Sequence, residues 1–240
     1  MTLFIRVAAL IMAFGMVSAQ AGEAETINTI RSALIKDVPF AATAQIRKTP
    51  IDGMYEVNGS GHILYVTADG RFVFNGDLID LQKQVNITEA TRSEARKAAV
   101  DELGEDNMVV YTPKGEVKHT VTVFTDIFCP YCQRLHQEMD QYMKQGVKVR
   151  YVFLPFKGPK SFATSVSVWC AKDQNEAMDM AKAGAEIEKQ SCDNPISRHQ
   201  ALATELGIRG TPAILLENGY LNPGYVPVDK LVKQMETMGL

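Results

Sequence analysis

The feature that most constrains this 240-residue chain is a pair of cysteines, Cys129 and Cys132, with two residues between them. The apolar run 121–125 predicts a strand before the pair, and apolar residues at helical spacing predict a helix from near Cys129 to Gly146. A further strand is expected over 147–154. A Cys-x-x-Cys pair at a strand-to-helix turn in this pattern is typical of thiol–disulfide redox proteins.

The position of the two cysteines predicts different roles for them. At a helix start, the Cys129 sulfur lies near unpaired backbone N–H groups and the positive end of the dipole, which lowers its pKa. Pro130 suits the first turn because its missing N–H would have no partner there. We expect Cys129 to be partly exposed and to attack a substrate disulfide. Cys132 lies one turn later on the apolar face, so we expect it to be buried and to resolve the mixed disulfide.

Two other interpretations of the pair are an inert structural disulfide and half of a zinc site. A zinc site would need a second Cys-x-x-Cys or a His pair, and the sequence has neither. His136 follows Cys132 by one turn, and we interpret it as a surface residue. We therefore expect no metal and no separate cofactor, because the Cys129–Cys132 disulfide itself carries the electrons.

The N-terminal segment 1–21 predicts a secretory signal peptide. Arg6 precedes an uncharged apolar run over 7–17, and Ala19 and Ala21 fit a small-residue cleavage site. An uncleaved membrane anchor is the alternative. Export would place the cysteines in an oxidising compartment, where disulfides persist. The net charge of −3 gives no case for binding nucleic acid.

Residues 22–85 predict a small N-terminal domain with one helix, over 25–36, and an antiparallel sheet. Glycine-containing turns separate its short β-like runs. The expected strands cover residues 44–49, 54–58, 62–67 and 71–74. About 60 residues form only a marginal core, and an exposed sheet edge favours pairing with a second chain. We therefore expect a homodimer formed through this domain.

Residues 86–105 predict a linker helix that is polar nearly all round, with a possible capping box formed by Thr91 and Glu94. Residues 106–240 predict a mixed α/β catalytic domain. Its expected later elements are a helical stretch over 160–206, a strand over 213–216 that leads into a hairpin, and a terminal helix near 228–235. The fold class is therefore α+β, with two domains joined by a helix.

Two segments resemble the thioredoxin fold. One is the CPYC sequence at the strand-to-helix turn, and the other is LGIRGTPA over 206–213. The resemblance implies a cis bond between Thr211 and Pro212, with an ordinary trans turn as the alternative. A cis bond would present the Thr211 backbone to an extended substrate peptide beside the cysteines. Tyr131 flanks the cysteines and is a candidate for contacting unfolded chains, or for packing against the Pro212 loop.

Over residues 25–235 the chain resembles the DsbC family of periplasmic disulfide isomerases. The resemblance rests on MYEVNGSGHILYVTADGRFVFNGDLIDL, VTVFTDIFCPYCQRLHQEM, WCAKDQNEAM, SCDNP and GIRGTPAILLENG. It implies a V-shaped homodimer in which two thioredoxin-like domains, each with a helical insertion, face an uncharged cleft. It also implies misfolded disulfide-containing periplasmic proteins as clients and a membrane reductase of the DsbD type as electron donor.

Cys170 and Cys192 enclose a charged segment that resembles the family's helical insertion, and we interpret them as a structural disulfide rather than a second redox pair. Two features limit what the resemblance implies, the dipeptide Pro130-Tyr131 and the residue at position 123. The family's usual dipeptide between the active cysteines is Gly-Tyr, whereas CPYC also occurs in the sister DsbG proteins. Val123 stands where thioredoxins have a buried acid, and Asp126 is not its equivalent. A thiol oxidase, a DsbG-like reductase and a non-catalytic holdase therefore stay open as alternative functions.

Overall fold

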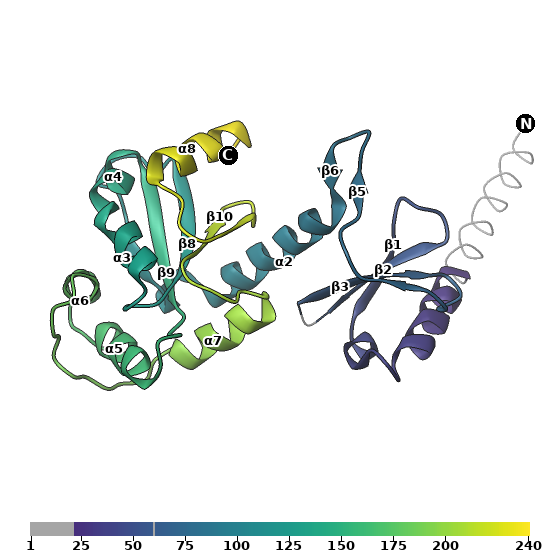
Figure 1. Ribbon diagram of the computed structural model, residues 1–240, viewed down its shortest axis with the longest axis horizontal. Helices are drawn as coiled ribbons and strands as arrows, with labels where there is room; N and C mark the ends of the chain where they lie inside the picture. The colour runs from purple at the N-terminus through teal and green to yellow at the C-terminus, as the bar shows by residue number, and fades with distance from the viewer. Residues whose placement is uncertain (1–21, 60) are drawn as a thin grey trace, which may run out of the picture. The chain divides into compact units, whose positions relative to one another are not determined.

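The computed structural model describes residues 22–59 and 61–240, and the chain divides into two compact units, one ending at Leu78 and the other beginning at Ile79 (Figure 1). The sequence-predicted signal peptide, residues 1–21, lies outside the described residues. None of the described helices is both long enough and apolar enough to cross a membrane.

The first unit is a helix packed on a four-stranded antiparallel sheet of order β1-β2-β3-β4. The helix covers residues 22–34, and a 3-10 turn, η1, covers Pro39–Ala42. The strands are β1 Gln45–Lys48, β2 Met54–Gly59, β3 His62–Thr67 and β4 Val73–Phe74, which confirms the four expected strands with the last one shorter. The core joins Ile30 and Leu34 of the helix to Tyr55, Val57 and Val66 of the sheet.

The turn between β3 and β4 depends on Gly70. Its φ is +73°, and a Cβ at this position would lie 2.5 Å from the Cβ of Ala33 on the helix. Only glycine fits this combination of backbone angle and close approach. The turn leads into β4, which forms one edge of the sheet, and the side chains of Val73 and Phe74 in this strand and of Phe72 just before it are exposed.

The second unit begins with a hairpin that the sequence analysis did not predict, β5 Ile79–Asp80 with β6 Val85–Asn86, followed by α2 Ile87–Leu103. The side chain of Asn86 caps α2 by accepting a hydrogen bond from the N–H of Glu89 at 2.9 Å. The predicted capping box at Thr91 is therefore wrong. The helix is also not solvated all round, because Val100 and Leu103 are buried in the core of this unit.

The main sheet of the second unit has the order β11-β10-β8-β9-β7, in which only β8 and β9 pair in parallel. The strands are β7 Val109–Tyr111, β8 His119–Thr125, β9 Val147–Phe153, β10 Ala213–Leu216 and β11 Leu221–Pro223. The helices are α3 Pro130–Gln137, α4 Met139–Lys144, α5 Pro159–Trp169, α6 Gln174–Lys182, α7 Ile196–Glu205 and α8 Val228–Thr237, with a short 3-10 turn, η2 Glu105–Asn107. This mixed α/β layer confirms the expected fold class.

Apolar clusters cover the two faces of this sheet. One cluster joins β8 and β9 to α3, α4, α5, α6 and α8, and the other joins β8, β9 and β10 to α2 and α7. Figure 1 shows α3 and α4 on one side of β8 and β9, with α2 and α7 on the other. The turn after β8, which carries Cys129 and Cys132, therefore rests on a sheet that is packed on both faces.

Two predicted helices are interrupted. The expected helix from Cys129 to Gly146 is divided into α3 and α4 at Glu138, whose carboxylate accepts hydrogen bonds from the Tyr225 hydroxyl and, at 3.0 Å, from the N–H of Val228. The expected helical stretch 160–206 is also too long. Residues 183–195 are not helical, because the chain leaves α6 through Gly184 at φ +84°.

Candidate active site

Cys129 and Cys132 lie at the junction of β8 and α3, as the sequence predicts. Cys129 occupies the N-cap position of α3, and Cys132 lies inside the first turn. Cys129 is 6% exposed, which is less than the partial exposure expected, whereas Cys132 is fully buried. Both are free thiols. A molecule approaching from solvent can therefore reach the Cys129 sulfur more readily than the Cys132 sulfur.

The pKa of Cys129 is lowered from its ordinary value. Burial acts to raise the pKa, but hydrogen bonds from the Thr211 side chain, the N–H and the side chain of Cys132 and the N–H of Tyr131 outweigh it. The two N–H groups belong to the first turn of α3, which leaves such donors without helical partners. The helix start thus stabilises the Cys129 thiolate, as the sequence analysis expected.

The peptide bond between Thr211 and Pro212 is cis, which confirms the expectation from the thioredoxin resemblance. The antiparallel pairing of Ala213 with Phe124 places the loop before β10 beside the end of β8. As a result, the Cys129 thiol donates a hydrogen bond of 3.2 Å to the carbonyl oxygen of Thr211. A groove of about 330 Å³ borders Thr211 and Pro212 and continues along residues 207–210.

Tyr131, between the two cysteines, is 60% exposed and stacks on Tyr225 with 6.4 Å between the ring centroids. The guanidinium of Arg134, on α3, lies 4.8 Å from the centroid of the Tyr225 ring. The ring of Tyr131 is therefore held beside the cysteines by stacking on Tyr225.

Asp126 supports the active-site turn structurally. Its fully buried carboxylate accepts hydrogen bonds from three backbone N–H groups, those of Phe128 at 2.7 Å, Phe156 at 2.6 Å and Lys157 at 2.9 Å. These bonds tie the turn after β8 to the loop after β9. Val123 is fully buried within β8, so this strand position presents no acid to the cysteines.

Cys132 has a different environment from Cys129. Burial raises the pKa of Cys132, while the positive charge of Lys182 and hydrogen bonds from the Thr125 hydroxyl and the Asp126 N–H oppose that rise. The sequence analysis did not identify Lys182. A signal was present, since Lys182 follows Met178 by four residues and shares its buried helix face.

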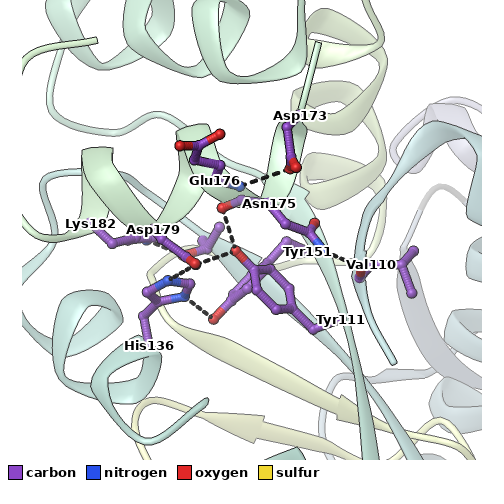
Figure 2. Close-up of polar contacts among 10 residues, drawn as sticks. Val110, Tyr111, His136, Tyr151, Asp173, Asn175, Glu176, Asp179 and Lys182 are labelled. Atoms are coloured by element: carbon purple, nitrogen blue, oxygen red, sulfur yellow. Dashed lines mark hydrogen bonds and ion pairs between the residues drawn. The ribbon is translucent and has the colours of Figure 1, made fainter. Parts of the chain in front are cut away.

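His136 is buried, so its interpretation as a surface residue is wrong. Its Nε2 lies 2.9 Å from Asp179 Oδ1, and its Nδ1 lies 3.1 Å from the Tyr151 hydroxyl. Figure 2 shows this histidine between the aspartate and the tyrosine. Within residues 22–59 and 61–240, no three His, Cys, Asp or Glu side chains are grouped to hold a metal ion.

Cys170 and Cys192 form a disulfide. It joins the end of α5 to the non-helical segment 183–195, away from the first turn of α3. Trp169 packs against the main core of the second unit.

Comparison with known families gives two matches that together span most of the chain. Residues 17–89 match the N-terminal domain of disulfide bond isomerase proteins, and residues 105–239 match a thioredoxin-like domain. The solved structure of a disulfide interchange protein from Neisseria gonorrhoeae matches with a TM-score of 0.51 and 27% identity, covering 56% of this chain and 96% of that one.

Two named relatives align over most of their length. The thiol:disulfide interchange protein DsbC of Salmonella typhimurium is 42% identical over 189 residues, which is 76% of each chain. DsbC of Escherichia coli K12 is 38% identical over 213 residues, covering 87% of this chain and 85% of the relative. With both domain matches and this level of identity, the chain belongs to the DsbC family of thiol:disulfide interchange proteins.

Proposed function

We propose that this protein is a periplasmic protein disulfide isomerase in which Cys129 attacks non-native disulfides of misfolded client proteins. The observation that carries the proposal is the contrast between the two thiols. Cys129 has a lowered pKa and keeps some exposure beside the Thr211 loop, whereas Cys132 is fully buried with a raised pKa. The thiolate is the nucleophile in disulfide exchange, so this contrast assigns attack to Cys129.

The reaction begins when the Cys129 thiolate forms a bond to one sulfur of a client disulfide and the other client sulfur leaves as a thiolate. That client thiolate can then attack a different disulfide of the same client, and a later client thiolate displaces Cys129, so that the client is rearranged without net oxidation. When the mixed disulfide persists, Cys132 attacks Cys129 and releases the client in reduced form. Cys132 is thus the resolving cysteine.

Thr211, Pro212 and Tyr131 are the proposed client-binding residues. The Thr211 carbonyl already accepts a hydrogen bond from the Cys129 thiol, so an extended client segment that pairs with this backbone would bring its sulfur to Cys129. The exposed ring of Tyr131 offers apolar contact area to an unfolded chain. We assign the Cys170–Cys192 disulfide a structural role.

Residues 22–85 are the proposed dimerisation domain, 86–105 the linker and 106–240 the catalytic domain. The support for a homodimer is the edge strand β4, where Val73 and Phe74, with Phe72 directly before them, are each about half exposed. An apolar edge strand with unpaired backbone groups favours pairing with a second copy of the chain. A membrane reductase of the DsbD type would keep Cys129 reduced, after export directed by a signal peptide over 1–21.

Refolding of a scrambled multi-disulfide protein tests the proposed activity. Wild type should restore native disulfides, Cys129→Ser should not, and Cys132→Ser should retain the first attack while accumulating mixed disulfides with clients. Full rescue by Cys129→Ser would replace the proposal with a holdase. Release of the client only in reduced form would favour a DsbG-like reductase.

The resting redox state separates the isomerase from a thiol oxidase. An isomerase needs Cys129 reduced, so alkylation of a periplasmic extract should label Cys129 and Cys132 while the Cys170–Cys192 pair stays protected. A mostly oxidised Cys129–Cys132 pair would favour the oxidase. The Cys170–Cys192 pair serves as an internal control for artefactual reduction during extraction.

A further inference from the structure

A buried lysine lies beneath the active-site turn. Lys182, near the end of α6, is only 4% exposed. Its Nζ donates hydrogen bonds to Thr125 Oγ1 at 2.7 Å and to the carbonyl oxygen of Asp126 at 2.8 Å. No carboxylate forms an ion pair with it among the residues that the structure describes. Because a buried charge without a counter-ion is costly, its presence calls for an explanation.

Thr125 connects this lysine to the resolving cysteine. The Thr125 hydroxyl accepts a hydrogen bond from Lys182. The same side chain acts on Cys132, because hydrogen bonding from Thr125 opposes the rise that burial causes in the pKa of Cys132. Cys132 is completely buried, so water does not reach its sulfur to remove the proton. The Thr125 hydroxyl can therefore pass a proton between Cys132 and Lys182.

The side chains around Lys182 leave it as the available proton acceptor. Asp179, on α6, lies 2.6 Å from the Tyr111 hydroxyl of β7 and 2.9 Å from His136 of α3, so its carboxylate is already engaged (Figure 2). Burial lowers the pKa of His136, which also has the Tyr151 hydroxyl as a partner. The Tyr151 ring of β9 lies 5.9 Å from Lys182 Nζ, and burial raises the pKa values of Tyr111 and Tyr151.

The remaining carboxylate near Lys182 belongs to Asp126, after β8. Its carboxylate accepts three backbone hydrogen bonds, from Phe128, Phe156 and Lys157, and its charge acts to raise the pKa of Lys182. The direct hydrogen bond from Lys182 goes to the main-chain carbonyl of Asp126. The network around Asp179 meanwhile holds α6 against α3, β7 and β9. The insertion that carries α6 thereby fixes the position of Lys182 below Cys132.

We propose that Lys182 is a positioning residue that accepts the proton of Cys132 through the Thr125 hydroxyl when the mixed disulfide is resolved. The inference rests on the proposed role of Cys132 as the resolving cysteine. Burial lowers the pKa of Lys182 to about 8, against the opposing effect of the nearby Cys132 sulfur. A fraction of Lys182 is therefore a neutral amine near pH 7, whereas an exposed lysine is almost fully protonated there.

The step balances without an added oxidant. The Cys132 thiol proton passes to the Thr125 oxygen as the Thr125 hydroxyl proton passes to the neutral amine of Lys182. The resulting Cys132 thiolate attacks Cys129 Sγ, the Cys129–Cys132 bond forms and the bond from Cys129 to the client breaks. The electron pair leaves on the client sulfur, which takes a proton from solvent. The resulting ammonium of Lys182 can donate to Thr125 along the 2.7 Å contact between Nζ and Oγ1.

Stopped-flow reaction of the reduced protein with 5,5′-dithiobis(2-nitrobenzoate) separates the two steps, since each step releases one coloured thiolate. The first, bimolecular phase reports attack by Cys129, and the second, unimolecular phase reports resolution by Cys132. For Lys182→Met we expect an unchanged first phase and a second phase that is roughly 100-fold slower at pH 7, the low end of a general base's contribution. Lys172→Met, which removes an exposed lysine near α6, is the matched control.

Two further variants test proton transfer itself. Lys182→Arg keeps the charge but cannot act as a base, and Thr125→Val keeps the lysine but removes the connecting hydroxyl. Both should slow the second phase and move its pH profile upward, with native fluorescence of Trp169 showing that each variant is folded. A normal second phase in Lys182→Met or in Lys182→Arg would overturn the proposal. The second phase of the wild type should disappear in Cys132→Ser. If the wild type shows no such phase, the proposed role of Cys132 as the resolving cysteine is wrong, whatever Lys182 does.

Discussion

Replacing Lys182 by methionine should stabilise the catalytic domain, because it removes a buried charge whose burial outweighs the attraction of the nearby Asp126 and cysteine charges. Methionine matches the length of the lysine stem and fills the same space with apolar atoms. The two oxygen atoms that accept hydrogen bonds from Lys182, in Thr125 and Asp126, each keep another hydrogen-bond partner in this variant. The Thr125 hydroxyl can still bond the Cys132 sulfur, and the Asp126 carbonyl lies 3.3 Å from the N–H of Cys129.

The magnitude follows from the pKa of Lys182, which burial lowers from 10.5 to about 8. Each pKa unit corresponds to 1.36 kcal/mol, so keeping this ammonium in the folded state costs about 3 kcal/mol at pH 7. Losing its hydrogen bonds costs about 1 kcal/mol, because both acceptors remain partnered. Lys182→Met should therefore raise the free energy of unfolding by about 2 kcal/mol.

The sign of the pH dependence distinguishes this cause from better packing. Between pH 8 and 10.5 the unfolded chain binds more protons at Lys182 than the folded chain, so wild-type stability rises with pH across this window. Below pH 8 Lys182 is charged in both states, so the full free-energy cost of burying its ammonium remains. The advantage of Lys182→Met should therefore be greatest below pH 8 and should shrink as the pH approaches 10.

Urea unfolding with Cys129 and Cys132 reduced measures this effect. Trp169 is the only tryptophan, so its fluorescence reports on the second unit. A gain of about 2 kcal/mol corresponds to a midpoint shift of about 1 M urea for a domain of this size. Lys172→Met should leave the midpoint unchanged. Destabilisation by Lys182→Met at pH 7, or a gain that persists unchanged to pH 10, would refute the reasoning.

Three other predictions concern the remaining cysteines and a buried histidine. The rate of Cys129 alkylation should stay high as the pH falls below the free-thiol pKa of about 8.5, and a rate that follows an ordinary thiol would contradict the lowered pKa. Replacing Cys170 and Cys192 by Ala should cost roughly 2–4 kcal/mol in urea unfolding while leaving Cys129 alkylation unchanged. Burial lowers the pKa of His199 to about 4, so the unfolded chain binds more protons between pH 6.5 and 4 and stability falls as the pH falls through that window. His199→Gln should flatten that slope in urea unfolding, and an unchanged slope would assign it to other groups.

The sequence predicts those parts of the site that depend on short, continuous segments of the chain. The strand-to-helix turn places Cys129 at a helix N-terminus, and the residues around Pro212 mark the facing loop. Each of these follows from a short segment and the backbone rules that apply to it. Their proximity, with the Cys129 thiol 3.2 Å from the Thr211 carbonyl, follows from the family resemblance and not from spacing.

What the sequence does not predict depends on contacts between distant segments. Glu138 ends α3 because Tyr225 and Val228, far along the chain, bond its carboxylate. The cap of α2 is Asn86 and not Thr91, because the hairpin of β5 and β6 places Asn86 directly before the helix. Helical periodicity contains neither kind of information, since it describes one segment at a time.

Lys182 and Val123 together suggest why the insertion helix matters to the chemistry. Val123 leaves the central strand with an apolar side chain where an acid could otherwise face the cysteines, and Cys132 is sealed from water. A buried thiol that must become a thiolate needs a proton acceptor within the protein. In this fold α6 supplies a titratable side chain at that place, held through Asp179 and His136. Because a structural role alone would be served at lower cost by an apolar residue, the buried charge of Lys182 is best explained by the reaction of Cys132.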